Sequence, residues 1–349
     1  MPEINKQDPR IVIYGVGQFG QMIARYAFEK GWPIVAAFNR AGPKVGQDLG
    51  QLAGLGKDLG VLVQDSETAD YSNLDADVAV VTHRDLLKDN IDAYRRLFGA
   101  GLNVLCHGVQ SYYPRCHDVA LAEEIDAMAK AAGATFTGSG IWDMSRIWSG
   151  ILTAGPCTEI TSIDITSISD AEAQTHSLEQ MKQFAISETV ERFYEKGIDK
   201  SIIAHGFKSV PEMVLVALGY DVIETTSVVE PVVFDEPVPS RHAPEGYLAA
   251  GLCMGIRMRS KTTTKQGVVG TATVDSRMIK PGEIEAMYWS VEGKPRTRTH
   301  VERLDSAHAT AGNLFNRIPD VIAARPGIVP VFEMGPLRHT ALVRGASSR

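Results

Sequence analysis

The fold of this chain is decided by the stretch RIVIYGVGQFG at residues 10–20. A short β-branched run ends in Gly15-Val16-Gly17-Gln18-Phe19-Gly20, and a helical pattern follows until Gly31. A second apolar run at residues 34–38 completes a βαβ unit of suitable length. The pattern GxGxxG in that context favours a dinucleotide-binding site, and the alternative is a structural glycine turn without a ligand.

Each position of this motif has its own expected role. Gly15 permits the tight turn, Gly17 lets the backbone approach a pyrophosphate, and Gly20 allows close packing of helix on strand. The helix begins at Gln18 and Phe19, where free N–H groups and the positive end of the helix dipole favour phosphate. We therefore expect all five residues to bind the cofactor.

The end of the second strand indicates which nicotinamide dinucleotide is bound. NAD sites place Asp or Glu there for the ribose 2′-hydroxyl, whereas this chain has Asn39-Arg40. An amide followed by a guanidinium can bind a 2′-phosphate through charge-assisted hydrogen bonds, and Lys44 can add to them. The residues therefore predict NADP(H) in preference to NAD(H). The alternative is that Arg40 is a solvated loop residue.

The following segments extend the same architecture. Strand-like runs at residues 60–63, 76–81 and 102–106 alternate with helical patterns at 87–98 and 120–132. This alternation predicts an α/β fold with a doubly wound parallel sheet of the Rossmann kind. Ligands of such sheets lie beyond the carboxyl ends of the strands, so four more residues are expected near the cofactor: Thr82, His83, His107 and Gly108. His83 is expected to contact nicotinamide or ribose rather than to do chemistry.

A second domain is predicted after about residue 145. Long strand-like runs dominate there, at residues 162–168, 223–233, 251–258 and 267–274, with helical stretches around 178–194 and 210–218. We expect an α+β domain with a mainly antiparallel sheet. The predicted division is a dinucleotide-binding domain at 1–145, to which 310–349 returns, and a substrate and oligomerisation domain at 146–309.

Composition restricts the class of protein. The net charge of −7 argues against a nucleic-acid partner, and no apolar run approaches the roughly 20 residues of a membrane span. The four cysteines show no ligand spacing, so neither a metal site nor a disulfide framework is expected. The polar start of the chain shows no signal peptide. We expect a cytoplasmic homodimer that binds a small-molecule substrate.

Several short segments, taken in order, carry a resemblance to a known family. They are the glycine motif at 15–20, Gly42–Gly50, Thr137-Gly138-Ser139-Gly140, Ala204-His205-Gly206, and Asn316–Pro319 leading into Ala323–Gly327. The chain resembles the dihydrodipicolinate-reductase-like oxidoreductases, and within them the 2,4-diaminopentanoate dehydrogenase and native amine dehydrogenase group. The resemblance implies reduction of an imine, formed from a carbonyl and ammonia, by hydride transfer from a nicotinamide.

The chain departs from this family where the amine is handled. The family glutamate that holds the amine maps onto Val109, with Gln110 beside it, and neither can ionise. The family Asn-Pro-Gly is replaced by Trp142-Asp143-Met144. A buried substrate ammonium needs a carboxylate, which Asp143 can supply from another direction. The expected substrate pocket comprises Val109, Gln110, Ser139, Gly140 and Trp142.

The proton donor is expected among His205, His107, Tyr113 and Asp143, since an imidazole, phenol or carboxyl group can protonate a developing amine or alkoxide. For His107 and His205 a packing or capping role is the alternative, and Tyr113 can simply shape its loop. Three functions follow. The first is an NADPH-dependent amine dehydrogenase, the second is an ammonia-independent ketone or aldehyde reductase, and the third is a non-catalytic NADP(H)-binding sensor.

Overall fold

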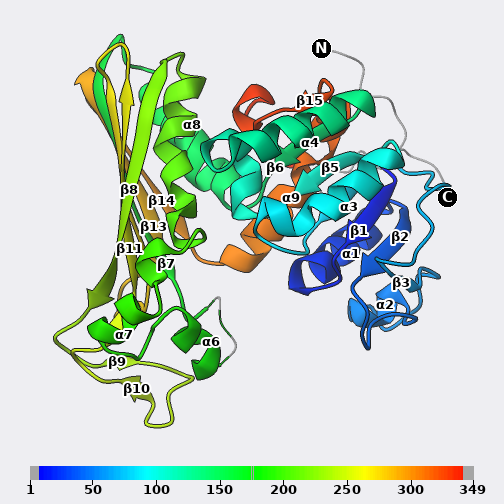
Figure 1. The fold of residues 1–349 in the computed structure, drawn as a ribbon, viewed down its shortest axis with the longest axis horizontal. Helices are drawn as coiled ribbons and strands as arrows, with labels where there is room; N and C mark the ends of the chain where they lie inside the picture. Colours follow the sequence, from blue (N-terminus) through cyan, green and yellow to red (C-terminus); the bar gives the residue numbers. More distant parts are fainter. Residues whose placement is uncertain (1–7, 174, 176, 341–349) are drawn as a thin grey trace, which may run out of the picture. The chain divides into compact units, whose positions relative to one another are not determined.

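A computed structural model describes residues 8–173, 175 and 177–340 of the chain (Figure 1). The chain divides into two compact units, residues 1–144 with 305–349 and residues 145–304. The predicted division placed these boundaries after residues 145 and 309, and its outermost segments, 1–7 and 341–349, lie outside the described residues. Residues 1–144 with 305–349 form unit 1, and residues 145–304 form unit 2.

Unit 1 is built on a seven-stranded parallel sheet in the order β15-β6-β5-β4-β1-β2-β3. Its strands are β1 (Ile11–Tyr14), β2 (Ile34–Asn39), β3 (Val63–Asp65), β4 (Val78–Val81), β5 (Asn103–Cys106), β6 (Thr135–Gly138) and β15 (Gly327–Ile328). The helices are α1 (Gln18–Lys30), α2 (Leu49–Leu52), α3 (Leu87–Gly99), α4 (Val119–Ala131) and α9 (Ser306–Ala323), with short 3₁₀ turns η1 (Val109–Tyr112), η2 (Pro114–Cys116) and η6 (Val331–Glu333).

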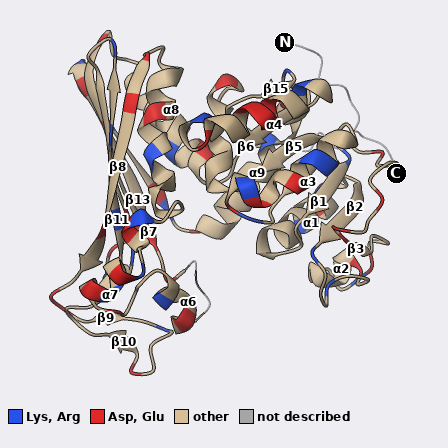
Figure 2. Ribbon diagram, viewed as in Figure 1, with Lys and Arg blue, Asp and Glu red and all other residues tan. Residues whose placement is uncertain are grey.

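Alternate side chains of β1 enter two different cores. Ile11 and Ile13 pack with α1 and α9, whereas Val12 and Tyr14 pack with α3 and α4. Because both faces of the sheet are covered, its central strands β1 and β4 consist of buried apolar residues, as expected for buried parallel strands. Charged residues of both signs lie on α3 and α4 (Figure 2), and Asp89, Glu123 and Lys130 are among those that are exposed. The doubly wound parallel sheet predicted from the sequence is confirmed.

Unit 2 contains a six-stranded sheet in the order β14-β13-β7-β12-β11-β8. The β7–β12 pairing is parallel and the other pairings are antiparallel, so the predicted mainly antiparallel sheet is confirmed. Its strands are β7 (Glu159–Asp170), β8 (Val222–Val233), β11 (Cys253–Thr264), β12 (Val269–Arg277), β13 (Glu285–Lys294) and β14 (Thr297–Arg303), and β9 (Val238–Pro239) pairs with β10 (Tyr247–Leu248).

Helices cover one face of this sheet, and α8 runs along it (Figure 1). The helical elements of unit 2 are α5 (Ser149–Ala154), α6 (Leu178–Gln183), α7 (Val190–Glu195), η4 (Ile198–Lys200), η5 (Ala204–Lys208) and α8 (Ser209–Ala217). A Cβ atom at Gly150 would lie 2.7 Å from the ring of Trp289, so glycine lets α5 approach β13 closely. A π-helical turn, η3 (Asp143–Trp148), spans the boundary between residues 144 and 145.

The prediction of a helical stretch around residues 178–194 is wrong in one respect, because the stretch is not continuous. It is interrupted between α6 and α7, where Ala185 and Ser187 have positive φ angles of 59° and 69°. The N–H of Ser187 donates to the carbonyl of Cys253, and the N–H of Cys253 donates to the carbonyl of Glu188, both at 2.8 Å. These bonds to β11 replace helical bonds and break the helix. Across residues 8–340, apart from 174 and 176, no helix is long and apolar enough to cross a membrane.

Candidate dinucleotide-binding site

In the glycine loop between β1 and α1, neighbouring backbone leaves no room for a side chain at two of the three glycines, whereas the third has free space beside it. A Cβ atom at Gly15, where φ is +101°, would lie 2.9 Å from the backbone of His83. A Cβ atom at Gly20 would lie 2.0 Å from the carbonyl oxygen of Gly15. At Gly17 the same atom would have no neighbour within 4 Å. Gly15 and Gly20 are therefore needed for packing, and Gly17 is the glycine that a ligand can approach.

The N-terminus of α1 faces this opening with unsatisfied donors. Gly17 is the N-cap residue and contributes no side-chain cap. The first N–H groups of an α-helix have no partner within the helix, and they carry the positive end of the helix dipole. Here they belong to Gln18, which is exposed, and to Phe19 and Gly20. The arrangement suits a phosphate group.

Asn39, the last residue of β2, holds the glycine loop. Its Oδ1 atom accepts the N–H of Val16 at 3.1 Å, and its Nδ2 atom donates to the carbonyl of Arg40 at 3.1 Å. One N–H of the amide is left for a ligand, since a primary amide carries two. Most of the hydrogen-bonding capacity of Asn39 is thus used within the protein, and its contact with a 2′-phosphate through the remaining N–H stays a prediction.

Two cations follow Asn39 along the chain. Arg40 is exposed, and the Nζ atom of Lys44 donates to the carbonyl of Val16 at 2.5 Å. Within the described part of the chain, no carboxylate forms an ion pair with either side chain. By contrast, Arg96 is paired with Glu67 at 2.6 Å. The end of β2 therefore carries two cations that form no ion pair, with Asp65 of β3 as the residue paired with Asn39 in the sheet.

The carboxyl end of β4 contributes Thr82 and His83. The Thr82 hydroxyl donates to the carbonyl of Gly15 at 2.7 Å, and the His83 ring meets Tyr14 edge-on at 5.8 Å. Burial lowers the pKa of His83, and the charges of Arg84 and Arg40 lower it further. The imidazole is therefore neutral at pH 7.

The carboxyl end of β5 contributes His107 and Gly108. The His107 ring lies 5.3 Å from that of Phe19, and its Nδ1 atom is buried without a hydrogen-bond partner among the described residues. Burial lowers the pKa of His107, while the charge of Asp85 acts in the opposite direction. A Cβ atom at Gly108 would lie 2.7 Å from the Asp85 carbonyl, so this turn packs tightly against the one after β4.

Asp143 has a structural role that the sequence did not reveal. Arg317 donates to both of its carboxylate oxygens, at 2.7 and 2.9 Å, and the Ser139 hydroxyl donates to it at 2.8 Å. Asp143 and Arg317 are both 0% exposed. This corrects two expectations, because neither the Asp143 carboxylate nor the Ser139 hydroxyl is free to meet a substrate. No local pattern in the sequence marks Arg317 as the partner of Asp143, because the two residues are 174 positions apart.

The remaining pocket candidates of unit 1 lie close together around η1 and β6. The Gln110 amide oxygen accepts the N–H of Leu87 at 3.0 Å, so this side chain caps α3. Trp142 stacks on Tyr112 with ring centroids 5.1 Å apart, and Gly140 would clash with the Tyr112 hydroxyl if it carried a Cβ atom. Val109 is half-buried at the start of η1. Tyr113 is half-buried, with its ring 6.3 Å from Phe332.

His205 lies in unit 2, and both of its ring nitrogens are engaged there. Nε2 lies 2.8 Å from the carbonyl oxygen of Asp199, and Nδ1 lies 2.7 Å from the Ser227 hydroxyl. A carbonyl can only accept, so Nε2 donates, and in the neutral ring Nδ1 accepts from Ser227. His205 thus connects η5 to β8, which favours the packing role over that of proton donor. No group of three or more His, Cys, Asp or Glu side chains in the described ranges is placed to hold a metal ion.

Comparisons with known proteins find relatives that match nearly the whole chain. Residues 150–346 match the model of the 2,4-diaminopentanoate dehydrogenase C-terminal domain. The chain is 24% identical over 341 residues to 2,4-diaminopentanoate dehydrogenase of Acetoanaerobium sticklandii, with 93% of each protein covered. It is 30% identical to an amine dehydrogenase from Mycobacterium smegmatis, with a TM-score of 0.83 over 95% of this chain and 98% of that one.

More distant structures share the fold alone. Biliverdin reductase from Synechocystis, for example, is 12% identical with a TM-score of 0.54 over 93% of this chain and 95% of that one. The domain model, in contrast, covers more than half of the chain. The chain therefore belongs to the family that carries the 2,4-diaminopentanoate dehydrogenase C-terminal domain, and it is an oxidoreductase.

Proposed function

We propose that the chain is an NADPH-dependent oxidoreductase of the amine dehydrogenase type, acting on a small imine formed from a carbonyl compound and ammonia. Two relatives with names of this kind, an amine dehydrogenase and a 2,4-diaminopentanoate dehydrogenase, match almost its whole length. Likeness of that extent supports the reaction class, whereas the choice of substrate depends on the residues of the site itself.

The observation that carries the proposal is the composition of the glycine loop and the end of β2. Gly17 is open, the first turn of α1 offers N–H groups, and Asn39 stands where an NAD site has a carboxylate. Arg40 and Lys44 provide cations close to that point. A dinucleotide with an additional phosphate on its adenosine ribose fits this set better than one without it.

The other strand ends supply groups for the reactive half of the cofactor. A bound nicotinamide supplies the hydride in such enzymes. His83 and His107 follow β4 and β5, next to the glycine loop, and both are held neutral by burial. We assign His83 to the cofactor. Of the predicted proton donors, His205 and Asp143 have their polar atoms engaged, whereas His107 Nδ1 has no partner among the described residues. His107 is therefore the candidate to test first, and Tyr113 stays a prediction from the sequence.

A second candidate function is supported by Val109. The resemblance to the family puts a carboxylate at this position, but the valine side chain cannot pair with an ammonium ion, and the Asp143 carboxylate is already paired with Arg317. A neutral carbonyl needs no carboxylate partner, so an ammonia-independent ketone or aldehyde reductase on the same scaffold is the alternative.

The test is NADPH oxidation by the purified protein with a panel of small aldehydes and ketones, each with and without ammonium. The proposed function requires turnover that depends on ammonia, and the second candidate requires turnover that does not. Tight NADPH binding without any turnover indicates the third function predicted from the sequence, a non-catalytic NADP(H)-binding sensor. The homodimer and the cytoplasmic location stay predictions, which sedimentation and cell fractionation check.

A further inference from the structure

His107 follows β5, and its backbone is held more firmly than its ring. Its N–H donates to the Val81 carbonyl at 3.1 Å, and the N–H of Gly108 donates to Sγ of Cys106 at 3.4 Å. In the ring, Nδ1 is buried without a hydrogen-bond partner among the described residues. Nε2 forms no hydrogen bond with a described residue either, but it is not buried, so it remains open to a ligand. The orientation of the ring therefore depends on packing.

The aromatic side chain that packs against His107 is that of Phe19, in the first turn of α1. The two ring centroids are 5.3 Å apart, and the ring planes are inclined by 57°. Phe19 is half-buried, and it also packs against the core that contains Ile11 of β1 and Leu314 of α9. A single side chain thus connects this core to the imidazole.

An imidazole that exchanges a proton with a substrate has to be held in place, because reacting atoms must lie about 3–3.5 Å apart. The usual support is a hydrogen bond to the second ring nitrogen. No described residue gives Nδ1 of His107 such a bond, and the contact with Phe19 takes its place. Burial also lowers the pKa of His107, while the charge of Asp85 and the Val81 carbonyl act in the opposite direction.

We propose that Phe19 is a positioning residue, whose side chain fixes the His107 ring with Nδ1 turned into the protein and Nε2 left open to the substrate. This inference rests on the proposed function, in which His107 is the first candidate for proton donation. The backbone N–H of Phe19 belongs to the free donors at the start of α1, which are expected to bind phosphate. Replacement of the side chain leaves that N–H in place, so the two roles can be separated.

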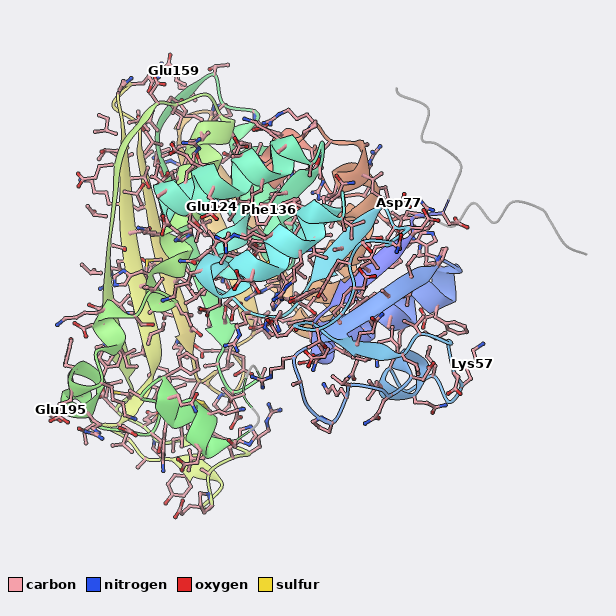
Figure 3. The ribbon with its side chains drawn as sticks, turned by 45° about the vertical axis from the view of Figure 1, so that its right-hand side comes forward. Lys57, Asp77, Glu124, Phe136, Glu159 and Glu195 are labelled. Atoms are coloured by element: carbon pink, nitrogen blue, oxygen red, sulfur yellow. The ribbon has the colours of Figure 1, made fainter. Side chains whose placement is uncertain are left out.

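The first test measures the pKa of His107 by NMR, with its signal assigned by comparison with His107→Asn. The variant is Phe19→Leu, which retains apolar volume against the core and loses the flat ring beside the imidazole. We expect the pKa of His107 to rise toward about 6.5 in this variant, because water reaches the ring. Phe28→Leu is the matched control and should leave that pKa unchanged. Phe28 belongs to the same helix, is 37% exposed, and has Nζ of Lys57 4.0 Å from its ring centre (Figure 3).

The second test measures turnover. In Phe19→Leu, kcat should fall about tenfold or more, whereas the dissociation constant of NADPH should change less than about twofold. In a His107→Asn background, Phe19→Leu should have no further effect on kcat, because Phe19 acts through the imidazole. Phe28→Leu should match the unsubstituted protein in both quantities.

Three outcomes overturn the inference. An unchanged pKa of His107 in Phe19→Leu means that the ring is held by other groups. Losses of kcat that multiply in the double variant mean that Phe19 does not act through His107. Equal losses of kcat and NADPH affinity mean that Phe19 supports the glycine loop. Should Phe19→Leu melt early, Phe19→Met takes its place. Failure of the proposed function is distinguishable, since the unsubstituted protein then reduces no carbonyl compound while the pKa of His107 still reports on Phe19.

Discussion

The Oδ1 atom of Asn39 accepts the backbone N–H of Val16 at 3.1 Å, so the end of β2 holds the glycine loop by a single side chain. An aspartate at position 39 can make the same bond and adds a negative charge. We expect Asn39→Asp to raise the dissociation constant of NADPH about tenfold or more through repulsion of the 2′-phosphate, and to leave NADH binding unchanged or improved. Asn39→Ala is the control, and it should weaken both cofactors because it releases the loop.

Alanine substitutions at two glycines of the motif should affect different properties, which are cofactor affinity at Gly17 and stability at Gly20. Gly17→Ala meets no neighbouring atom and has an extended backbone, with φ of −83°, so its melting temperature should match that of the unsubstituted protein. Its affinity for NADPH should fall because the methyl group occupies the ligand's approach. Gly20→Ala places a carbon 2.0 Å from the Gly15 carbonyl oxygen and should lower the melting temperature. Unchanged cofactor affinity in Gly17→Ala would place the ligand elsewhere.

The titration of His83 reports on the same site. Burial and the charges of Arg84 and Arg40 lower its pKa in the folded protein, opposed by Glu67. The unfolded chain therefore takes up this proton first, and His83 contributes stability that is present above pH of about 6.5 and is lost as the pH falls through the folded pKa.

We expect Arg40→Ala to raise the pKa of His83, measured by NMR, and to weaken NADPH binding about tenfold or more while NADH binding stays the same. An equal loss for both cofactors would show that Arg40 does not read the phosphate.

The buried pair of Asp143 and Arg317 should matter for stability rather than for chemistry. Asp143→Asn removes the negative charge that faces Arg317 and leaves an amide oxygen, the partly exposed Asp320 and the Gly335 carbonyl as partners, and such a loss of charge costs about 3–5 kcal/mol of unfolding free energy. Glu124→Gln is the matched control, because the exposed Arg95–Glu124 pair should contribute at most about 1 kcal/mol. Chemical denaturation measures both. An Asp143→Asn protein of full stability and greatly reduced turnover would return Asp143 to the reaction.

Measurements of stability and turnover also distinguish between the two histidines that were predicted as proton donors. His205→Asn breaks the bonds that connect η5 to β8 and should lower the melting temperature. His107→Asn should retain the melting temperature and NADPH affinity and should lower turnover by about 10²–10⁴-fold if the imidazole is the general acid. Full turnover in His107→Asn would leave Tyr113 as the candidate.

The parts of the fold that depend on local pattern were predictable. The spacing of Gly15, Gly17 and Gly20 after an apolar strand defines a βαβ unit, and alternation of strands with helices defines the parallel sheet. Only the structure shows that Gly17 has free space beside it, whereas Gly15 and Gly20 are closely packed.

The parts that depend on distant partners were not predictable. Asp143 looked like a candidate for chemistry because its partner Arg317 lies 174 residues away. The sequence did not indicate a partner for His205, because His205 lies in η5 and Ser227 lies in β8. A polar side chain is available for chemistry only if tertiary contacts leave it unused, and pattern alone does not reveal those contacts.

The most direct test of the proposed reaction is the initial rate of NADPH oxidation with a panel of small aldehydes and ketones, measured with and without ammonium. Val109→Glu and NADH serve as comparison arms. We predict turnover with NADPH that requires ammonium, slower turnover with NADH, and faster ammonium-dependent turnover in Val109→Glu, where a carboxylate can hold the amine. Ammonium-independent turnover, turnover with NADH alone, or no oxidation of either cofactor would contradict this assignment.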